Sequence, residues 1–123
     1  MQFAYWMILA AALLPYVMAG AAKSGGGIDN ARPRVGLEKL EGWRQRADWA
    51  QRNHFEAFPA FAAGVIVAEL VHARQGTIDW LAGCFVLFRI GYSVAYLAGQ
   101  PALRSGCWLG GIVCMIALFC IGA

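Results

Sequence analysis

Charged side chains are scarce in this sequence. Only 14% of its 123 residues are charged and 60% are hydrophobic, whereas about 25% of the residues in a soluble domain carry a charge. A chain with so little polar surface is typical of integral membrane proteins. Its length corresponds to one membrane domain that includes all of residues 1–123.

The sequence also lacks the motifs of several common active sites. It contains no Walker loop, dinucleotide fingerprint, HExxH pair or serine elbow, so no motif supports a phosphate-loop or hydrolase function. Its cysteines lie in or beside apolar runs without the CxxC spacing of a metal site. We therefore expect reduced packing residues, no disulfide framework and no bound metal at Cys84, Cys107, Cys114 and Cys120.

Basic residues are few but unevenly distributed. Seven of the ten Lys and Arg residues fall between Lys23 and Arg52, and the net charge is only +3. This distribution indicates a membrane-orientation signal and not a nucleic-acid footprint. We expect no nucleic-acid partner, and we expect the basic segment to face the cytoplasm.

Four apolar segments have the length of membrane helices, because about 20 residues cross about 30 Å of hydrocarbon. A polar loop over residues 23–43, with an amphipathic lead-in, precedes the second segment. The alternative for the first segment, a cleaved signal peptide, would need a basic start that Met1 and Gln2 do not provide. The predicted fold is all-α, an integral membrane four-helix up-and-down bundle with spans at 3–22, 55–73, 78–98 and 103–121.

In this topology the first and third connections lie on the same membrane face. The start of the second span, the end of the third and the start of the fourth then meet there. Their polar side chains suit a small anionic ligand that also has an amine, such as a peptide-like thiol. The predicted pocket contains Arg52, Asn53, Glu56, Tyr92, Tyr96 and Arg104.

Arg89 stands in the middle of the third span, where a charge is costly. We expect it to have a structural role, in an interior ion pair with Glu56 or a bond to a helix carbonyl. Pro59 is a second structural residue, because it frees the carbonyl of Phe55 and should bend the helix and open a cavity.

Several of these residues also have simpler explanations. Tyr92 and Tyr96 are compatible with an aromatic belt at the membrane interface, and Arg104 with a headgroup anchor. Glu69 and His72 are compatible with snorkelling at the far interface.

Three motifs occur in order along the chain: Arg52-Asn53-x-x-Glu56-x-x-Pro59, Arg89-x-x-Tyr92-x-x-x-Tyr96 and Pro101-Ala-Leu-Arg104-Ser105. With four spans and a basic first loop, they resemble the MAPEG family, the membrane-associated proteins of eicosanoid and glutathione metabolism. The resemblance extends over nearly the whole chain.

The resemblance implies a homotrimer with glutathione as co-substrate, bound between neighbouring subunits, and no metal. By position, Arg104 would activate the glutathione thiol. The thiolate would then attack a lipophilic electrophile or a lipid hydroperoxide, as in a glutathione transferase or peroxidase. The active-site face would be cytoplasmic, and membrane lipids would surround the trimer.

The resemblance also implies residues that bind glutathione. Asn53 and Glu56 would hold its backbone and amino group. Several members of the family have an arginine where this chain has Trp49, and Arg46, one turn earlier, would substitute for it. The remaining implied contacts are Arg52 with Arg32 or Arg34 at the carboxylates, and Tyr92, Tyr96 and Ser105 in the pocket.

Two other functions fit the same sequence. A non-enzymatic lipid-binding or scaffold member of the family would keep the fold without the chemistry. A small transporter would use Glu56, Glu69 and Arg89 as an ion relay, although no inverted repeat supports it.

Overall fold

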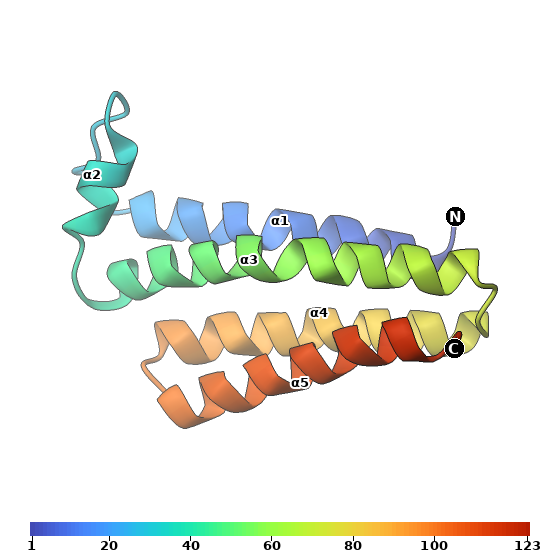
Figure 1. Cartoon of the computed structure of the whole chain (residues 1–123). Coiled ribbons are helices and arrows are strands. Elements are labelled where there is room, and N and C mark those ends of the chain that lie inside the picture. Colours follow the sequence, from blue (N-terminus) through green and yellow to red (C-terminus); the bar gives the residue numbers. More distant parts are fainter.

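A computed structural model describes all residues, 1–123, and contains helices but no strands. Four long helices lie side by side, and a short one packs across one end of them (Figure 1). The fold is therefore that of an all-helical protein. The helices are α1 (Phe3–Lys23), α2 (Pro33–Glu38), α3 (Gly42–Leu70), α4 (Gln75–Leu97) and α5 (Pro101–Cys120).

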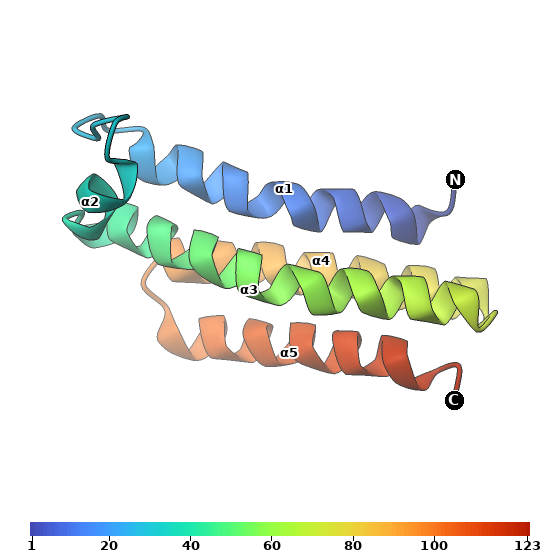
Figure 2. The same ribbon diagram turned by 45° about the horizontal axis from the view of Figure 1, so that its top comes forward.

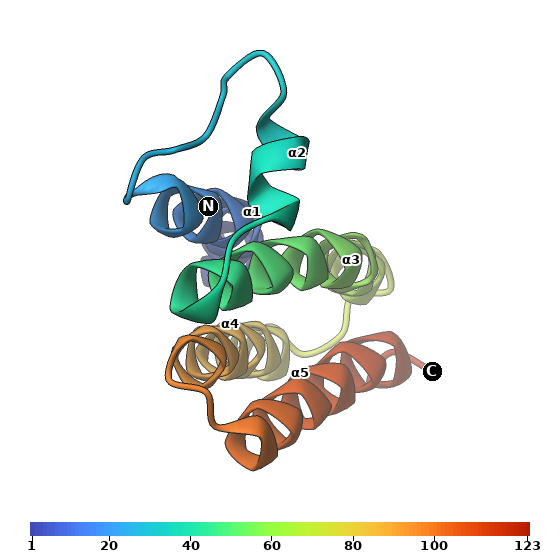
Figure 3. The same cartoon turned by 90° about the vertical axis from the view of Figure 1, so that its left-hand side faces the viewer.

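The long helices alternate in direction, so the connections gather at two ends. The segment that contains α2 and the turn between α4 and α5 lie at one end, which we call the loop end (Figures 1 and 2). The α3–α4 turn and both chain termini lie at the other. Viewed from the loop end, α1 and α3 form one layer over α4 and α5 (Figure 3). The turn into α5 uses Gly99, whose φ of 69° suits a residue without Cβ.

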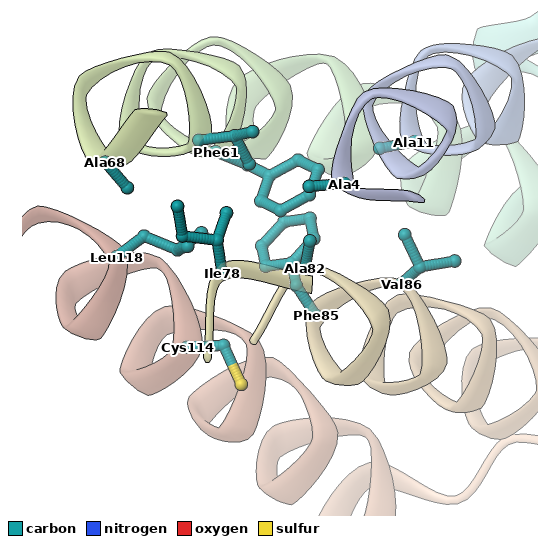
Figure 4. Close-up of a cluster of buried hydrophobic side chains, with 11 residues drawn as sticks. Ala4, Ala11, Phe61, Ala68, Ile78, Ala82, Phe85, Val86, Cys114 and Leu118 are labelled. Carbon is teal, nitrogen blue, oxygen red and sulfur yellow. The ribbon is translucent and has the colours of Figure 1, made fainter. Parts of the chain in front are cut away.

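The apolar core fills the half of the molecule near the termini (Figure 4). Phe61 of α3 stacks on Phe85 of α4 with ring centroids 3.9 Å apart. Alanines on the neighbouring helices, such as Ala4 and Ala82, allow the backbones to approach these rings closely. All four long helices contribute to this core, whereas the loop-end half has only two small apolar clusters of three buried residues each.

Large apolar side chains cover the outer surface, as a membrane requires. Trp80 and Leu87 are 73% and 69% exposed. The helices α1, α4 and α5 are each long and apolar enough to cross a bilayer. Helix α1 contains the predicted segment 3–22, whereas the predicted segments 78–98 and 103–121 end one residue beyond α4 and α5. The chain is a membrane protein.

The second predicted span, 55–73, and the predicted loop, 23–43, differ from the structure. Helix α3 begins at Gly42, continues through the amphipathic lead-in and ends at Leu70. Because its first half is charged, α3 is not among the helices whose composition is apolar enough to span a bilayer. Within the predicted loop, residues 33–38 form α2, whose first residue Pro33 has a φ suited to starting a helix.

The arrangement of the connections leads to a labelling prediction. Cysteines introduced at Ser24 and Gln100, in a variant without native cysteines, should react with an impermeant maleimide from the same side of the membrane. A cysteine at Arg74 should react only from the other side, because the α3–α4 turn lies at the opposite end. By the positive-inside rule, the Ser24 side should be cytoplasmic. Labelling of Ser24→Cys and Arg74→Cys from one side would contradict the arrangement.

Candidate functional site

Arg89 is the centre of a buried polar network between α3 and α4. Its side chain is only 2% exposed. Nη2 donates to Asn53 Oδ1 at 2.7 Å, and Nε and Nη2 donate to His54 Nδ1 at 3.2 and 2.9 Å. Two neutral side chains therefore supply the acceptors that a buried guanidinium needs.

The predicted ion pair between Arg89 and Glu56 is absent, and Glu56 is exposed. The reason is helix geometry: each residue turns an α-helix by about 100°, so Glu56 lies about 200° around the axis from His54. Asn53 and His54 bond to Arg89 of α4, whereas Glu56 lies outside the arc between them and is exposed. The structural role predicted for Arg89 thus involves other partners. Pro59 lies inside α3 but lines none of the pockets, so it opens no cavity in the protomer.

The hydrogen-bond geometry assigns the protons that join Arg89, His54 and Ser93. Arginine N–H groups only donate, so His54 Nδ1 must accept and its ring proton must lie on Nε2. Nε2 is 2.6 Å from Ser93 Oγ, to which it donates. The Ser93 hydroxyl then donates to the Arg89 carbonyl oxygen at 3.0 Å. The hydrogen bonds form a closed circuit through a neutral histidine.

A chain of aromatic contacts connects this network with the loop end. The Arg89 guanidinium carbon lies 4.3 Å from the Tyr92 ring centroid, and the His54 ring meets Tyr92 edge to face at 5.8 Å. Tyr92 contacts Tyr96 edge to face at 5.4 Å, and the Arg104 guanidinium carbon lies 4.9 Å from the Tyr96 centroid. Tyr92 is only 5% exposed, so it does not belong to an interface belt.

Two pockets lie on either side of Tyr96 and Arg104, which line both of them. The Arg46 pocket, of about 290 Å³, also contains Arg46, Trp49 and Gln100. The Trp108 pocket, of about 280 Å³, is completed by Tyr92, Ser105 and Trp108. A molecule in either pocket can therefore contact Arg104.

Arg46 brings a second guanidinium to the first of these pockets. Its Nη2 donates to the Leu97 carbonyl oxygen at 3.1 Å, while its buried Nε has no partner. An unpaired buried donor is costly. Arg46 and Trp49 line the same pocket. Arg46 is therefore close to the position at which this chain has Trp49 in place of the arginine expected from the resemblance.

Arg52 and Arg34 lie elsewhere in the protomer. They line the Arg52 pocket, of about 410 Å³, on the side of α3 that faces α2. Arg52 forms an ion pair with the buried Asp48 at 3.1 Å, and Gln51 Oε1 in the same pocket is buried without a partner. This pocket shares no residue with the other two, so a single chain does not bring the whole predicted set together.

The remaining predicted residues are divided in the same way. Ser105 joins Arg104 in the Trp108 pocket. Glu56 and Arg32 are exposed and line no pocket. Asn53 is used inside the protomer by Arg89. The structure has no group of three or more His, Cys, Asp or Glu side chains arranged to hold a metal.

Two residues of the network, His54 and Ser93, were not expected from the sequence as functional residues. Ser93 offered a signal, because it follows Arg89 by four residues and therefore shares its helix face. His54 is adjacent to Asn53, and only the rotation of α3 relative to α4 decides that both face Arg89.

Comparison with known proteins gives one match. A family model described as the MAPEG family matches residues 3–123. No curated protein and no solved structure matches the chain.

The hydrogen bonds of Arg89 lead to a stability prediction. Asn53→Ala should lower the free energy of unfolding by about 1–3 kcal/mol, the cost of an unsatisfied buried donor. The control is Glu56→Gln, which should change it by less than about 0.5 kcal/mol because Glu56 makes no such contact. Thermal unfolding of both variants in detergent measures the difference. Equal destabilisation would contradict the assignment of Asn53 as the partner of Arg89.

Proposed function

This chain belongs to the MAPEG family, and on that premise we propose that it is a membrane-bound, glutathione-dependent enzyme. It activates the glutathione thiol for attack on lipophilic electrophiles or lipid hydroperoxides. Arg104 is the activating residue, and glutathione is a co-substrate that binds at the loop end. The basic residues of the first connection favour a cytoplasmic position for this end.

The observation that carries the proposal is the position of Arg104 between two pockets. Its guanidinium rests on the Tyr96 ring, and the structure gives it no carboxylate partner. A cation that is held by an aromatic face keeps its hydrogen-bond donors and its charge available for a ligand. A headgroup anchor would need no pocket on either side of it.

Thiol activation follows from electrostatics. The thiolate is the nucleophile, and a free thiol with a pKa near 8.5 is only partly ionised at neutral pH. At an effective dielectric near 20, a guanidinium about 4 Å from the sulfur stabilises the thiolate by up to about 4 kcal/mol. Half of that energy is enough to bring the pKa of the bound thiol close to neutrality.

The second substrate approaches through the bilayer. Trp108, which lines the Trp108 pocket, is 42% exposed, and Leu103 and Leu109 of the same helix are 59% and 56% exposed, so α5 has apolar surface for lipid. With an electrophile, the sulfur bonds to carbon as the leaving group departs with its electron pair. With a hydroperoxide, the thiolate attacks the distal oxygen to form a sulfenic acid, the O–O bond breaks, and the departing alkoxide takes a proton from water to become an alcohol. A second glutathione thiol then attacks the sulfenic acid, which gives glutathione disulfide and water.

Glutathione itself needs more than one protomer. Arg46 would bind one of its carboxylates, and Arg52 and Arg34 line the Arg52 pocket on another face of α3. A trimer would place the Arg52 pocket of one protomer beside Arg104 of the next. Glu56, exposed on α3, would then meet the amino group. This division of the binding residues favours a homotrimer with sites between subunits.

The role of Arg104 is tested by substitution. Arg104→Ala should lower the conjugation rate at pH 7 by about tenfold to a thousandfold, the range for lost electrostatic stabilisation. Glutathione affinity should change little, and the thiolate absorbance of the bound co-substrate should disappear. Arg104→Lys should restore part of the rate, because an ammonium keeps the charge without the planar fork. If Arg104→Ala conjugates generic electrophiles as fast as the parent, Arg104 is only an anchor.

Sites between subunits predict complementation. Arg34→Ala and Arg104→Ala should each impair glutathione turnover, since each removes one side of the site. Co-expressed, the two variants should recover activity, because mixed trimers contain some sites with both arginines. Tyr96→Ala with Arg104→Ala is the control that should not recover, since both changes affect the same side. Absence of recovery in purified mixed trimers would refute the shared site.

A further inference from the structure

We infer that His54 is a positioning residue for the reaction. Together with Ser93, it orients Arg89 against Tyr92 and so fixes the pair of tyrosines on which Arg104 rests. This inference rests on the proposed function, because it assigns a consequence for Arg104. The network itself is independent of any ligand.

The first step is that His54 constrains Arg89 in two ways. Its Nδ1 accepts from Nε and Nη2 of the guanidinium, at 3.2 and 2.9 Å. Through Ser93 it also reaches the Arg89 carbonyl, with distances of 2.6 and 3.0 Å. The imidazole thus contacts the tip of Arg89 directly and its backbone through Ser93. Since no carboxylate contacts the guanidinium, its orientation depends on these neutral bonds and on the bond from Nη2 to Asn53 Oδ1 at 2.7 Å.

The second step is that the held guanidinium determines the position of Tyr92. The Arg89 guanidinium carbon lies 4.3 Å from the Tyr92 ring centroid, and the His54 ring centroid lies 5.8 Å from it in a T-shaped arrangement. Interactions between a cation and a ring face depend on the placement of the cation over the ring. A rotation of the imidazole would therefore shift both neighbours of Tyr92 together.

The third step is that the position of Tyr92 affects Arg104 through Tyr96. Tyr92 meets Tyr96 edge to face at 5.4 Å, and Tyr96 supports the Arg104 guanidinium at 4.9 Å. Both tyrosines line the Trp108 pocket with Arg104. Because the stabilisation of a thiolate depends on its distance from the cation, a small shift of this support affects the chemical step more than the binding of glutathione.

The test uses two substitutions that break the same bond from opposite sides. His54→Asn keeps an acceptor near Arg89 but is too short to reach Ser93, and Ser93→Ala removes the hydroxyl. Each should lower kcat at pH 7 by about tenfold, with little change in the Kd for glutathione. The double variant should be no worse than either single one, since both remove one interaction.

The chain offers matched controls. His72→Asn changes the other histidine, which is exposed at the opposite end and has a φ of 57° that asparagine tolerates. Ser24→Ala removes a hydroxyl that donates to a carbonyl of its own helix, as Ser93 does, but at an exposed position. Both controls should keep the parent kcat and Kd.

A second measurement needs no glutathione. In protein labelled with fluorotyrosine, the ¹⁹F resonances of Tyr92 and Tyr96, identified by Tyr→Phe variants, should move in Ser93→Ala and not in Ser24→Ala. Unmoved resonances would overturn the inference. Moved resonances with parent kcat would overturn its catalytic consequence. A network that served only folding would reduce the yield of trimer but leave kcat per folded protein unchanged, which also counts against it.

The experiments distinguish failure of the proposed function from failure of the positioning role of His54. If the parent protein neither binds nor ionises glutathione, the proposed function is wrong, while the fluorine resonances still decide whether His54 and Ser93 position the tyrosines. If the parent ionises glutathione and His54→Asn and Ser93→Ala retain full turnover, the proposed function stands and the positioning role is wrong.

Discussion

The burial of Arg89 is the constraint on which the loop-end half of the molecule depends. A guanidinium between helices requires acceptors for its donors, and an isolated buried charge is strongly unfavourable. Asn53 and His54 meet this requirement from a single turn of α3. Their bonds fix how α3 and α4 are rotated and aligned, because a shift by one residue would turn both acceptors away by about 100°.

The long helices pack in two different ways along their length, through apolar contacts near the termini and through polar contacts at the loop end. Near the termini, Phe61 and Phe85 stack among small residues, and close contact alone joins the helices. Within a membrane the lipid is as apolar as the core, so association there depends on packing and on polar contacts more than on the hydrophobic effect. At the loop end, the Arg89 network supplies the polar contacts. The chemistry that we propose lies directly beside this network, at Tyr96 and Arg104.

Helix α3 also explains why one protomer holds only part of the proposed site. Its polar residues occupy two opposite faces: Arg46 and Asn53 face α4, whereas Asp48 and Arg52 face α2. A helix that is polar on both faces is poorly suited to face lipid on either of them. Neighbouring copies of the chain would cover the second face, which is consistent with the proposed trimer.

The sequence by itself determined the class of structure and the family. Apolar runs of about 20 residues can satisfy their backbone in lipid only as helices, so composition was sufficient to predict an all-helical membrane protein. The three motifs in order were sufficient for the resemblance, which the family match over residues 3–123 confirms. Only the tertiary structure decided the partners of Arg89, the role of His54 and the separation of Arg52 from Arg104. Helical spacing shows which residues share a face, but it does not show which face of one helix meets which face of another. That depends on the rotation of packed helices, and here buried polar bonds between segments 35 to 39 residues apart fix this rotation.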